Sequence, residues 1–236
     1  MSLARQTLLE VRGLDAFYGL AQAVSGVNLK VARGEAVALV GRNGAGKSTT
    51  LKAIMGLIER RTDAMTFGGH DIRQQPTHHV ARLGLGYVPE ERRIFTDLTV
   101  AENLEVGRLA ARGGRASWTP ARLYEIFPNL GEMSGRSAGH ISGGEQQMLA
   151  IARTLMGNPE MVLLDEPSEG LAPVIVELMA EAIRRMKEDG IAVLLSEQNL
   201  PFAASIAERA VVIETGNITF DGSITELLDR ERRQTK

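Results

Sequence analysis

Short apolar runs separated by turn residues characterise the N-terminal third of the chain. Runs of this length, bounded by Gly, Asp and Asn, are typical of strands rather than helices. Three of them predict a small antiparallel sheet, at Leu8–Val11, Val27–Val31 and Met65–Phe67. A fourth, Glu35–Val40, is apolar almost throughout, which favours a strand buried on both faces beside that sheet.

The pattern becomes helical between Glu102 and Gly157. Thr119-Pro120 marks a helix start, because Thr is a good N-cap and Pro at the first helical position costs no hydrogen bond. Two glycine-containing loops interrupt the region, at Arg112–Arg115 and Ser134–Ser137. We interpret residues 90–157 as a helical lobe inserted into a larger domain.

Short strands alternate with amphipathic helices beyond Asp165. This alternation predicts parallel strands covered by helices, and therefore an α/β fold. Asp221-Gly222-Ser223 predicts a turn and, with Glu226, the capping box of a last helix, after which a frayed basic tail is expected. The preceding elements are predicted as helix Val174–Glu188, strand Ile191–Leu195, helix Leu200–Glu208 and strands Ala210–Ile213 and Ile218–Phe220.

Composition narrows the class of protein. At 236 residues the chain is long enough for one large domain, with or without an inserted lobe. Its formal net charge of -2 predicts no nucleic acid partner, and the absence of cysteine excludes disulfides and zinc–thiolate sites. Since it shows neither a signal-like N-terminus nor an apolar stretch of about 18 residues, any work at a membrane would be that of a peripheral subunit.

A glycine-rich segment links the buried strand to a helix pattern that runs from Ser48 to Gly56. Its glycines let backbone N–H groups approach a phosphate chain, and the helix N-terminus then faces the negative charge. We predict a nucleotide site in which Lys47 contacts the β- and γ-phosphates as a catalytic group and Ser48 ligates Mg²⁺. An ordinary glycine turn is the alternative, which the flanking elements disfavour. The predicted site comprises Gly41, Arg42, Asn43, Gly44, Ala45, Gly46, Lys47, Ser48 and Thr49.

A second apolar run, Met161–Leu164, ends in two adjacent carboxylates. Successive side chains of a strand point to opposite faces, so Asp165 and Glu166 are expected to have different roles. We predict that Asp165 holds Mg²⁺ through water and that Glu166 orients or deprotonates the attacking water. A polar strand end before Pro167 is the alternative, and it would be preferred without the phosphate loop.

Ser142-Gly143-Gly144-Glu145 precedes a predicted helix and suits a second phosphate clamp, because it offers a hydroxyl and bare N–H groups at a helix N-terminus. Together with the other two motifs, in this order, it resembles the signature motif of ATP-binding-cassette (ABC) ATPases. The resemblance extends along essentially the whole chain. It implies one domain over residues 1–236, an ABC-type P-loop NTPase with a RecA-like core, a small antiparallel β subdomain and an inserted helical subdomain, which hydrolyses ATP with Mg²⁺.

The resemblance also implies a second ABC ATPase subunit as partner, identical or not. In that family the signature of one cassette closes over the γ-phosphate held by the other, so Ser142–Glu145 would serve the partner's ATP. Tyr18 matches the aromatic residue that stacks on adenine. Without the resemblance, Tyr18 would be interpreted as a packing residue.

Three positions depart from the family pattern. Glu90 stands where the glutamine loop usually has Gln, and its carboxylate can still reach Mg²⁺ or water. Gln198 occupies the place of the switch histidine, which leaves a hydrogen-bonding sensor role near the γ-phosphate and removes proton transfer. Ala172 replaces the Asp of the dimer-facing loop, so coupling between the two sites is expected to be built differently.

These departures, with Pro89–Phe95 and Leu98–Leu104, resemble the second ATPase subunit of branched-chain amino acid importers. The resemblance implies contact with integral membrane permease subunits through Glu90–Leu104, and an indirect partnership with a substrate-binding protein. It places the chain on the cytoplasmic face of the cell membrane as a peripheral subunit. Urea and short amides remain open as alternative cargo.

Two functions outside transport are alternatives. A soluble ABC ATPase of translation or DNA repair is disfavoured by the single phosphate loop and by the lack of sustained heptads. A regulator without turnover is disfavoured because Lys47, Ser48, Asp165 and Glu166 are all present.

Overall fold

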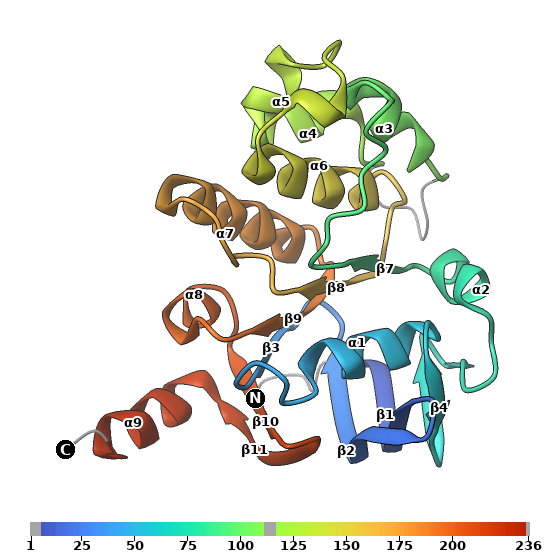
Figure 1. The fold of residues 1–236 in the computed structure, drawn as a ribbon, viewed down its shortest axis with the longest axis vertical. Coiled ribbons are helices and arrows are strands. Elements are labelled where there is room, and N and C mark those ends of the chain that lie inside the picture. The colour runs from blue at the N-terminus through green and yellow to red at the C-terminus, as the bar shows by residue number, and fades with distance from the viewer. Residues whose placement is uncertain (1–5, 111–116, 235–236) are drawn as a thin grey trace.

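The computed structural model describes residues 6–110 and 117–234, in which helices surround two β-sheets (Figure 1). The loop predicted at Arg112–Arg115 lies outside these ranges. Within them, no helix has both the length and the apolar character needed to cross a membrane.

The predicted antiparallel sheet is present, with longer strands. It comprises β1 (Thr7–Tyr18), β2 (Ala21–Ala32), β4 (Glu59–Arg61), β5 (Ala64–Phe67) and β6 (His70–Asp71), in the order β2-β1-β5-β6 with β4 also paired to β1. The β1–β2 pairing shifts register between Val11 and Leu14. Such a shift moves the buried positions from one alternate set to the other, so the sequence alternation ends at Val11 although the strand continues.

The predicted parallel strands form the second sheet. Its members are β3 (Ala36–Val40), β7 (Leu85–Val88), β8 (Met161–Asp165), β9 (Ala192–Glu197), β10 (Arg209–Glu214) and β11 (Asn217–Ser223). The order is β11-β10-β3-β9-β8-β7, and only the β10–β11 pair is antiparallel. Strand β7 was not predicted, because its short apolar run, Leu85–Val88, is broken by Gly86.

Alternation along β3 divides the interior into two cores. Val37 and Leu39 face α1 (Lys47–Met55), α2 (Thr77–Arg82) and the antiparallel sheet, whereas Ala38 and Val40 face the other helices. Because β3 is buried on both faces, the phosphate-loop segment that follows it starts from a fixed position.

The helical lobe lies between β7 and β8 in the sequence and above the parallel sheet in Figure 1. One of its helices starts at Thr119-Pro120 as predicted, since the Thr119 side chain accepts a hydrogen bond from the Arg122 N–H at 3.3 Å. The lobe contains α3 (Val100–Val106), α4 (Pro120–Ile126), α5 (Pro128–Glu132), a 3₁₀ turn (Ala138–His140) and α6 (Gly143–Leu155).

Three further helices complete the fold: α7 (Pro173–Glu188), α8 (Leu200–Ala204) and α9 (Ile224–Gln234). The frayed tail was a wrong prediction for Arg230, Arg232 and Arg233, because α9 continues through them, whereas Lys236 lies outside the described residues. Arg230 pairs with Glu226 one turn earlier at 2.9 Å and stacks over the Phe220 ring at 4.5 Å. The turn predicted at Asp221–Ser223 belongs to β11, although Ser223 Oγ does accept the Glu226 N–H at 3.1 Å.

Candidate nucleotide site

The predicted phosphate loop leaves the carboxyl end of β3 and turns directly into α1, whose first residue is Lys47. Gly41 has no room for a side chain, because a Cβ would lie 2.4 Å from the Ile213 carbonyl oxygen. Gly44 and Gly46 have φ angles of 77° and 111°, which L side chains rarely adopt. The loop therefore requires glycine at these positions for its own shape, before any ligand is considered.

Two cavities adjoin the loop. One of about 310 Å³ is lined by Gln22, Ala23, Gly44, Gly46, Lys47, Ser48, Thr49, Glu166, Thr215 and Gly216. The other, of about 950 Å³, lies between residues 41–45 and α9, and Arg42, Asn43 and Gln198 are among its lining. The smaller cavity brings the predicted lysine, hydroxyl and carboxylate together, so it is the candidate position for the phosphates.

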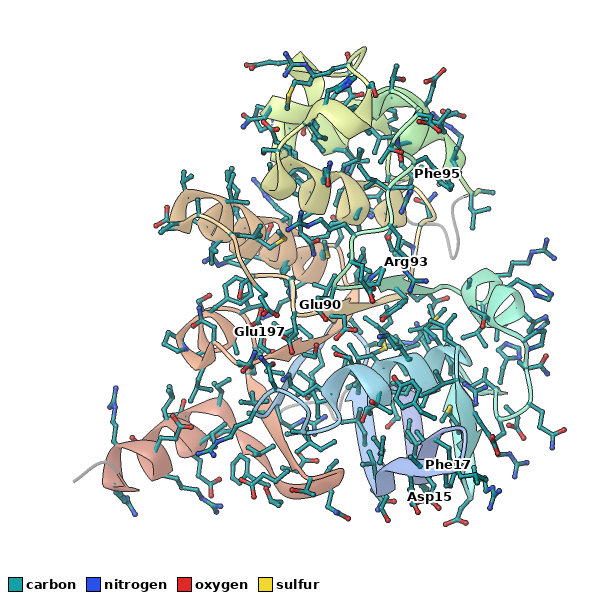
Figure 2. All side chains as sticks on the ribbon, viewed as in Figure 1. Asp15, Phe17, Glu90, Arg93, Phe95 and Glu197 are labelled. Atoms are coloured by element: carbon teal, nitrogen blue, oxygen red, sulfur yellow. The ribbon has the colours of Figure 1, made fainter. Side chains whose placement is uncertain are left out.

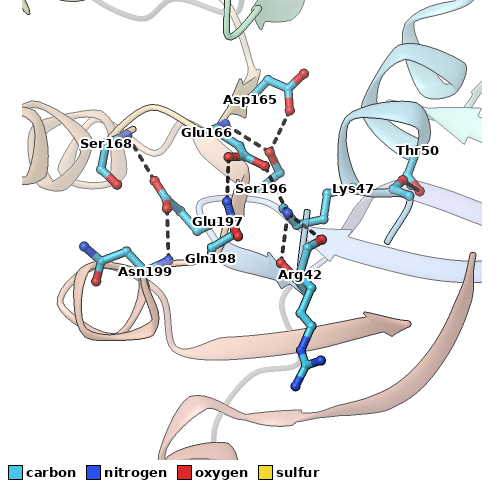
Figure 3. A network of polar contacts seen from close by, with 12 residues as sticks. Arg42, Lys47, Thr50, Asp165, Glu166, Ser168, Ser196, Glu197, Gln198 and Asn199 are labelled. Carbon is cyan, nitrogen blue, oxygen red and sulfur yellow. Dashed lines mark hydrogen bonds and ion pairs between the residues drawn. The ribbon is translucent and has the colours of Figure 1, made fainter. Parts of the chain in front are cut away.

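Lys47 is buried and folds back over its own loop (Figure 3). Its Nζ donates to the carbonyl oxygens of Gly41 at 2.8 Å and Arg42 at 3.1 Å. It also lies 3.0 Å from Glu166 Oε1, as an ion pair. The ammonium group is thus held at the floor of the smaller cavity by three oxygen partners.

Asp165 ends β8 and is almost completely buried. Its Oδ1 accepts a hydrogen bond from Ser196 Oγ at 2.7 Å, and its Oδ2 accepts one from Tyr87 Oη at 3.0 Å. Burial and the Asp165 charge raise the pKa of Tyr87, which keeps the phenol protonated as a donor. Asp165 is therefore fixed by side chains from β9 and β7.

Glu166 follows Asp165 in a left-handed backbone conformation, with φ of 45°. That conformation is costly for a non-glycine residue. Glu166 lies beyond the end of β8, so strand alternation does not set its direction, but its side chain has other partners than that of Asp165. Glu166 Oε2 accepts a hydrogen bond from Gln198 Nε2 at 3.2 Å. Burial opposes ionisation, but hydrogen bonds from Glu169 and Lys47 outweigh it and hold the pKa of Glu166 below its ordinary value.

Two further glutamates, absent from the predicted site, shape its rim. Glu197 is buried and accepts the backbone N–H groups of Ser168 at 3.1 Å and Asn199 at 3.3 Å, which ties the loop after β8 to the loop after β9 (Figure 3). Glu169 shares a hydrogen bond with Glu166, and this bond, with some burial, raises the pKa of Glu169 to about 7. The only available sequence signal was their position beside predicted site residues.

Residues 24–169 match the model of the ABC transporter family, and this stretch contains all three motifs. The chain belongs to the ABC transporter family. This ABC ATPase is 39% identical to BraG of Pseudomonas aeruginosa, a high-affinity branched-chain amino acid transport ATP-binding protein, over 94% of the chain and 95% of BraG. It is 34% identical to the lipopolysaccharide export ATP-binding protein LptB of Haemophilus influenzae, over 96% of the chain and 95% of LptB.

A solved ATP-binding subunit of an ABC transporter has the same fold, with a TM-score of 0.79 at 31% identity over 97% of this chain and 93% of that one. The predicted fold class, an ABC-type P-loop NTPase with a small antiparallel β subdomain, is thereby confirmed. The enzyme class, an ATPase, is confirmed by the same family membership.

Some predicted site residues of this ABC ATPase lie apart from the smaller cavity. Tyr18 ends β1 and is about half exposed, outside the lining of either cavity. Ser142–Glu145 begins α6 and lines neither cavity. There, Glu145 Oε2 accepts the Ser142 N–H at 2.6 Å and Ser142 Oγ accepts the Glu145 N–H at 3.3 Å, a capping box.

The donor set suits magnesium in part. Asp165 and the Ser48 hydroxyl offer the hard oxygen atoms that Mg²⁺ prefers. Ser48 lines the smaller cavity, and Asp165 ends β8 directly before Glu166, which also lines it. Glu90 is exposed on the loop after β7, and no hydrogen bond or ion pair joins it to Ser48 or Asp165 in the described residues (Figure 2). The assignments of Ser48, Asp165 and Glu90 as Mg²⁺ ligands all stay predictions.

Proposed function

We propose that this chain is the ATP-hydrolysing subunit of a membrane importer for branched-chain or related amino acids. The observation that carries the catalytic part is the buried Lys47–Glu166 ion pair, with Gln198 bonded to Glu166, beside the phosphate loop. The similarity to BraG over almost the whole chain supports the cargo class.

ATP would bind with its phosphates in the smaller cavity, where Lys47 exchanges Glu166 for the β- and γ-phosphate oxygens. Bound Mg²⁺, held by Ser48 and Asp165, would neutralise phosphate charge. Glu166, released from Lys47 and still within reach of Gln198, would orient the attacking water and accept its proton. Gln198 can donate a hydrogen bond to the γ-phosphate or to Glu166, but it cannot carry the proton.

The active unit would be a pair of cassettes. Ser142–Glu145 lines neither cavity of its own chain, so a role in phosphate binding requires a second ATPase subunit, whether a copy or a sister cassette. A helix N-terminus with bare glycine N–H groups is suited to the γ-phosphate on the partner's loop. One chain would then contribute to two sites.

The permease would dock on Glu90–Leu104, on the cytoplasmic face of the membrane. Phe95 in this segment is 48% exposed, and Arg153 stacks over its ring at 4.9 Å (Figure 2). Asn103, fully buried, holds the Phe95 backbone through hydrogen bonds to its N–H at 3.0 Å and from its own amide to the Phe95 carbonyl at 2.9 Å. A rigidly presented aromatic ring is the kind of group that anchors a protein interface.

The experiment that tests this function is purification of the tagged full-length chain from native membranes, followed by identification of the co-purifying subunits. Permease subunits that transport leucine, isoleucine or valine in vesicles, with ATP and the chain present, would support the proposal. Permeases for urea or short amides would support that alternative cargo. Because the chain is 34% identical to LptB, a lipopolysaccharide export system is a second candidate, and co-purifying lipopolysaccharide-export proteins would support it. Co-purification of ribosomes or DNA instead of membrane proteins would contradict a role in transport.

A further inference from the structure

Arg92, on the loop between β7 and α3, lies against the N-terminus of α6. A Cβ built on Gly143 would be 2.5 Å from Arg92 Nη1, with Cζ at 3.2 Å and Nη2 at 3.3 Å. The flat guanidinium therefore lies on the glycine of Ser142–Glu145, the segment that the proposed function assigns to the partner's γ-phosphate. A glycine at position 143 is what allows this approach.

The charges at this place are not balanced within the chain. Among the described residues, no hydrogen bond or ion pair satisfies the Arg92 guanidinium, whereas the neighbouring Arg93 pairs with Glu91 at 3.7 Å. The N-terminus of a helix carries partial positive charge, so a cation there is unfavourable unless an anion joins it. Glu145, the nearest acid of the segment in sequence, is already turned onto the Ser142 N–H.

The backbone holds Arg92 in this position. Arg92 and Arg93 have φ angles of 62° and 47°, two consecutive non-glycine residues in the left-handed region. The Arg92 N–H donates to the Pro89 carbonyl at 3.0 Å, and Arg153 Nη2 donates to the Arg93 carbonyl at 2.6 Å. These contacts, which link the loop to α6, fix the loop in a strained shape that carries the guanidinium to the helix end.

We propose that Arg92 contacts the γ-phosphate of the ATP held by a second copy of this chain, beside Ser142–Glu145 and in trans to the phosphate loop. The inference rests on the proposed two-cassette site. An arginine is always charged and can donate two parallel hydrogen bonds to phosphate oxygens, so it can stabilise the charge that spreads over them during transfer.

The first test compares ATP turnover of the full-length chain with that of Arg92→Ala, Arg92→Lys and the control Arg73→Ala, at rising protein concentration. Arg73 pairs with Asp71 at 2.6 Å beside the antiparallel sheet, outside the proposed docking segment and the nucleotide site. Ala and Arg pay the same left-handed backbone cost, and Arg92 has no partner in the described residues, so the folded state should tolerate the change; thermal unfolding checks this. We expect Arg92→Ala to lose roughly 10- to 100-fold in kcat, the value of a hydrogen bond to a charged group. Arg92→Lys should recover part of the loss, and Arg73→Ala should match the unaltered chain.

The second test asks whether Arg92 acts in trans. Lys47→Ala breaks the phosphate loop but keeps Arg92, while Arg92→Ala does the reverse. When the two variants are combined one to one and pair at random, half of the pairs contain one chain of each kind. Each such pair holds one intact site out of two, so activity should recover to about a quarter of that of the unaltered chain. A parallel mixture of Lys47→Ala with Ser142→Glu should recover in the same way.

The outcomes of the two mixtures distinguish a failure of the proposed Arg92 role from a failure of the proposed two-cassette site. If the Ser142→Glu mixture does not recover, the shared site between copies is wrong, and the inference falls with it. If that mixture recovers but the Arg92→Ala mixture stays inactive, only the inference is overturned. A faster Arg92→Ala variant would also overturn it, because the guanidinium would then be blocking the helix end rather than serving the phosphate.

Discussion

Lys47 and Glu166 form an ion pair of 3.0 Å across the phosphate cavity, with only 2% and 7% of their side chains exposed. The pair joins the start of α1 to the turn after β8, elements that are far apart in the sequence. It joins the cation that is proposed to bind phosphate to the proposed general base. Under the proposed function, nucleotide phosphates would compete with Glu166 for the same ammonium group.

This competition predicts opposite effects of one substitution on binding and on turnover. Glu166→Gln removes the charge that holds Lys47, so ATP should bind at least as tightly as before. Turnover should fall by about 10²- to 10⁴-fold, because the general base is lost. Equilibrium nucleotide binding and phosphate release measure the two effects. Glu160→Gln, which alters a carboxylate paired with Arg33 away from the site, is the control, and unchanged turnover in Glu166→Gln would refute the base assignment.

A second prediction concerns the link between the loops that carry Glu166 and Gln198. Glu197→Ala leaves the buried Ser168 N–H without an acceptor, which costs about 1–3 kcal/mol, and removes the partner of the part-buried Asn199 N–H. Both the free energy of unfolding and kcat should drop. Glu197→Gln keeps one acceptor oxygen, and because burial raises the pKa of Glu197, loss of its charge should be tolerated better than loss of the side chain. Equal losses in the two variants would show that the hydrogen bonds do not position the loops.

The Glu166–Glu169 contact predicts a pH dependence. The hydrogen bond to Glu166, with burial, raises the pKa of Glu169 from 4.5 to about 7. A carboxyl group with a raised folded-state pKa contributes stability that is fully present below its unfolded pKa and is lost as the pH rises through the folded value. The unfolding temperature of the unaltered chain should therefore fall, relative to that of Glu169→Gln, between about pH 5 and pH 8. The Gln amide still donates to Glu166 but does not titrate, so parallel profiles for the two proteins would rule out a shared proton.

The sequence was most informative where chemistry depends on adjacent residues. The glycines of the phosphate loop and the Asp165–Glu166 pair follow directly from local geometry, and the structure places the loop, Lys47, Ser48 and both carboxylates at one end of the parallel sheet. The exact membership of the site, and the roles of these residues, remain predictions.

Contacts between distant segments were not predictable in this way. Lys47–Glu166 and Glu197–Ser168 join residues brought together only by the order of strands in the sheet, an order that no single segment encodes. The extra length of β1 was hidden by its register shift. A last helix was predicted, but its second half, from Arg230, was taken for a frayed tail because the stabilising contact of Arg230 over Phe220 crosses to another element. Tertiary contacts overrode the local pattern in each case.

The exposed Phe95 ring provides the test of coupling to a permease. Phe95→Asp should abolish or strongly reduce ATP-driven transport in vesicles containing the complete complex, because a charged group cannot fill an apolar contact without a desolvation cost. Nucleotide binding should stay unchanged, since Phe95 lines neither phosphate-loop cavity. Phe95→Leu keeps an apolar side chain at the same rigid position and is the matched control, expected to retain most transport. Full transport by Phe95→Asp would exclude this ring from the permease contact, whereas parallel loss of nucleotide binding would point to misfolding of the loop that Asn103 supports.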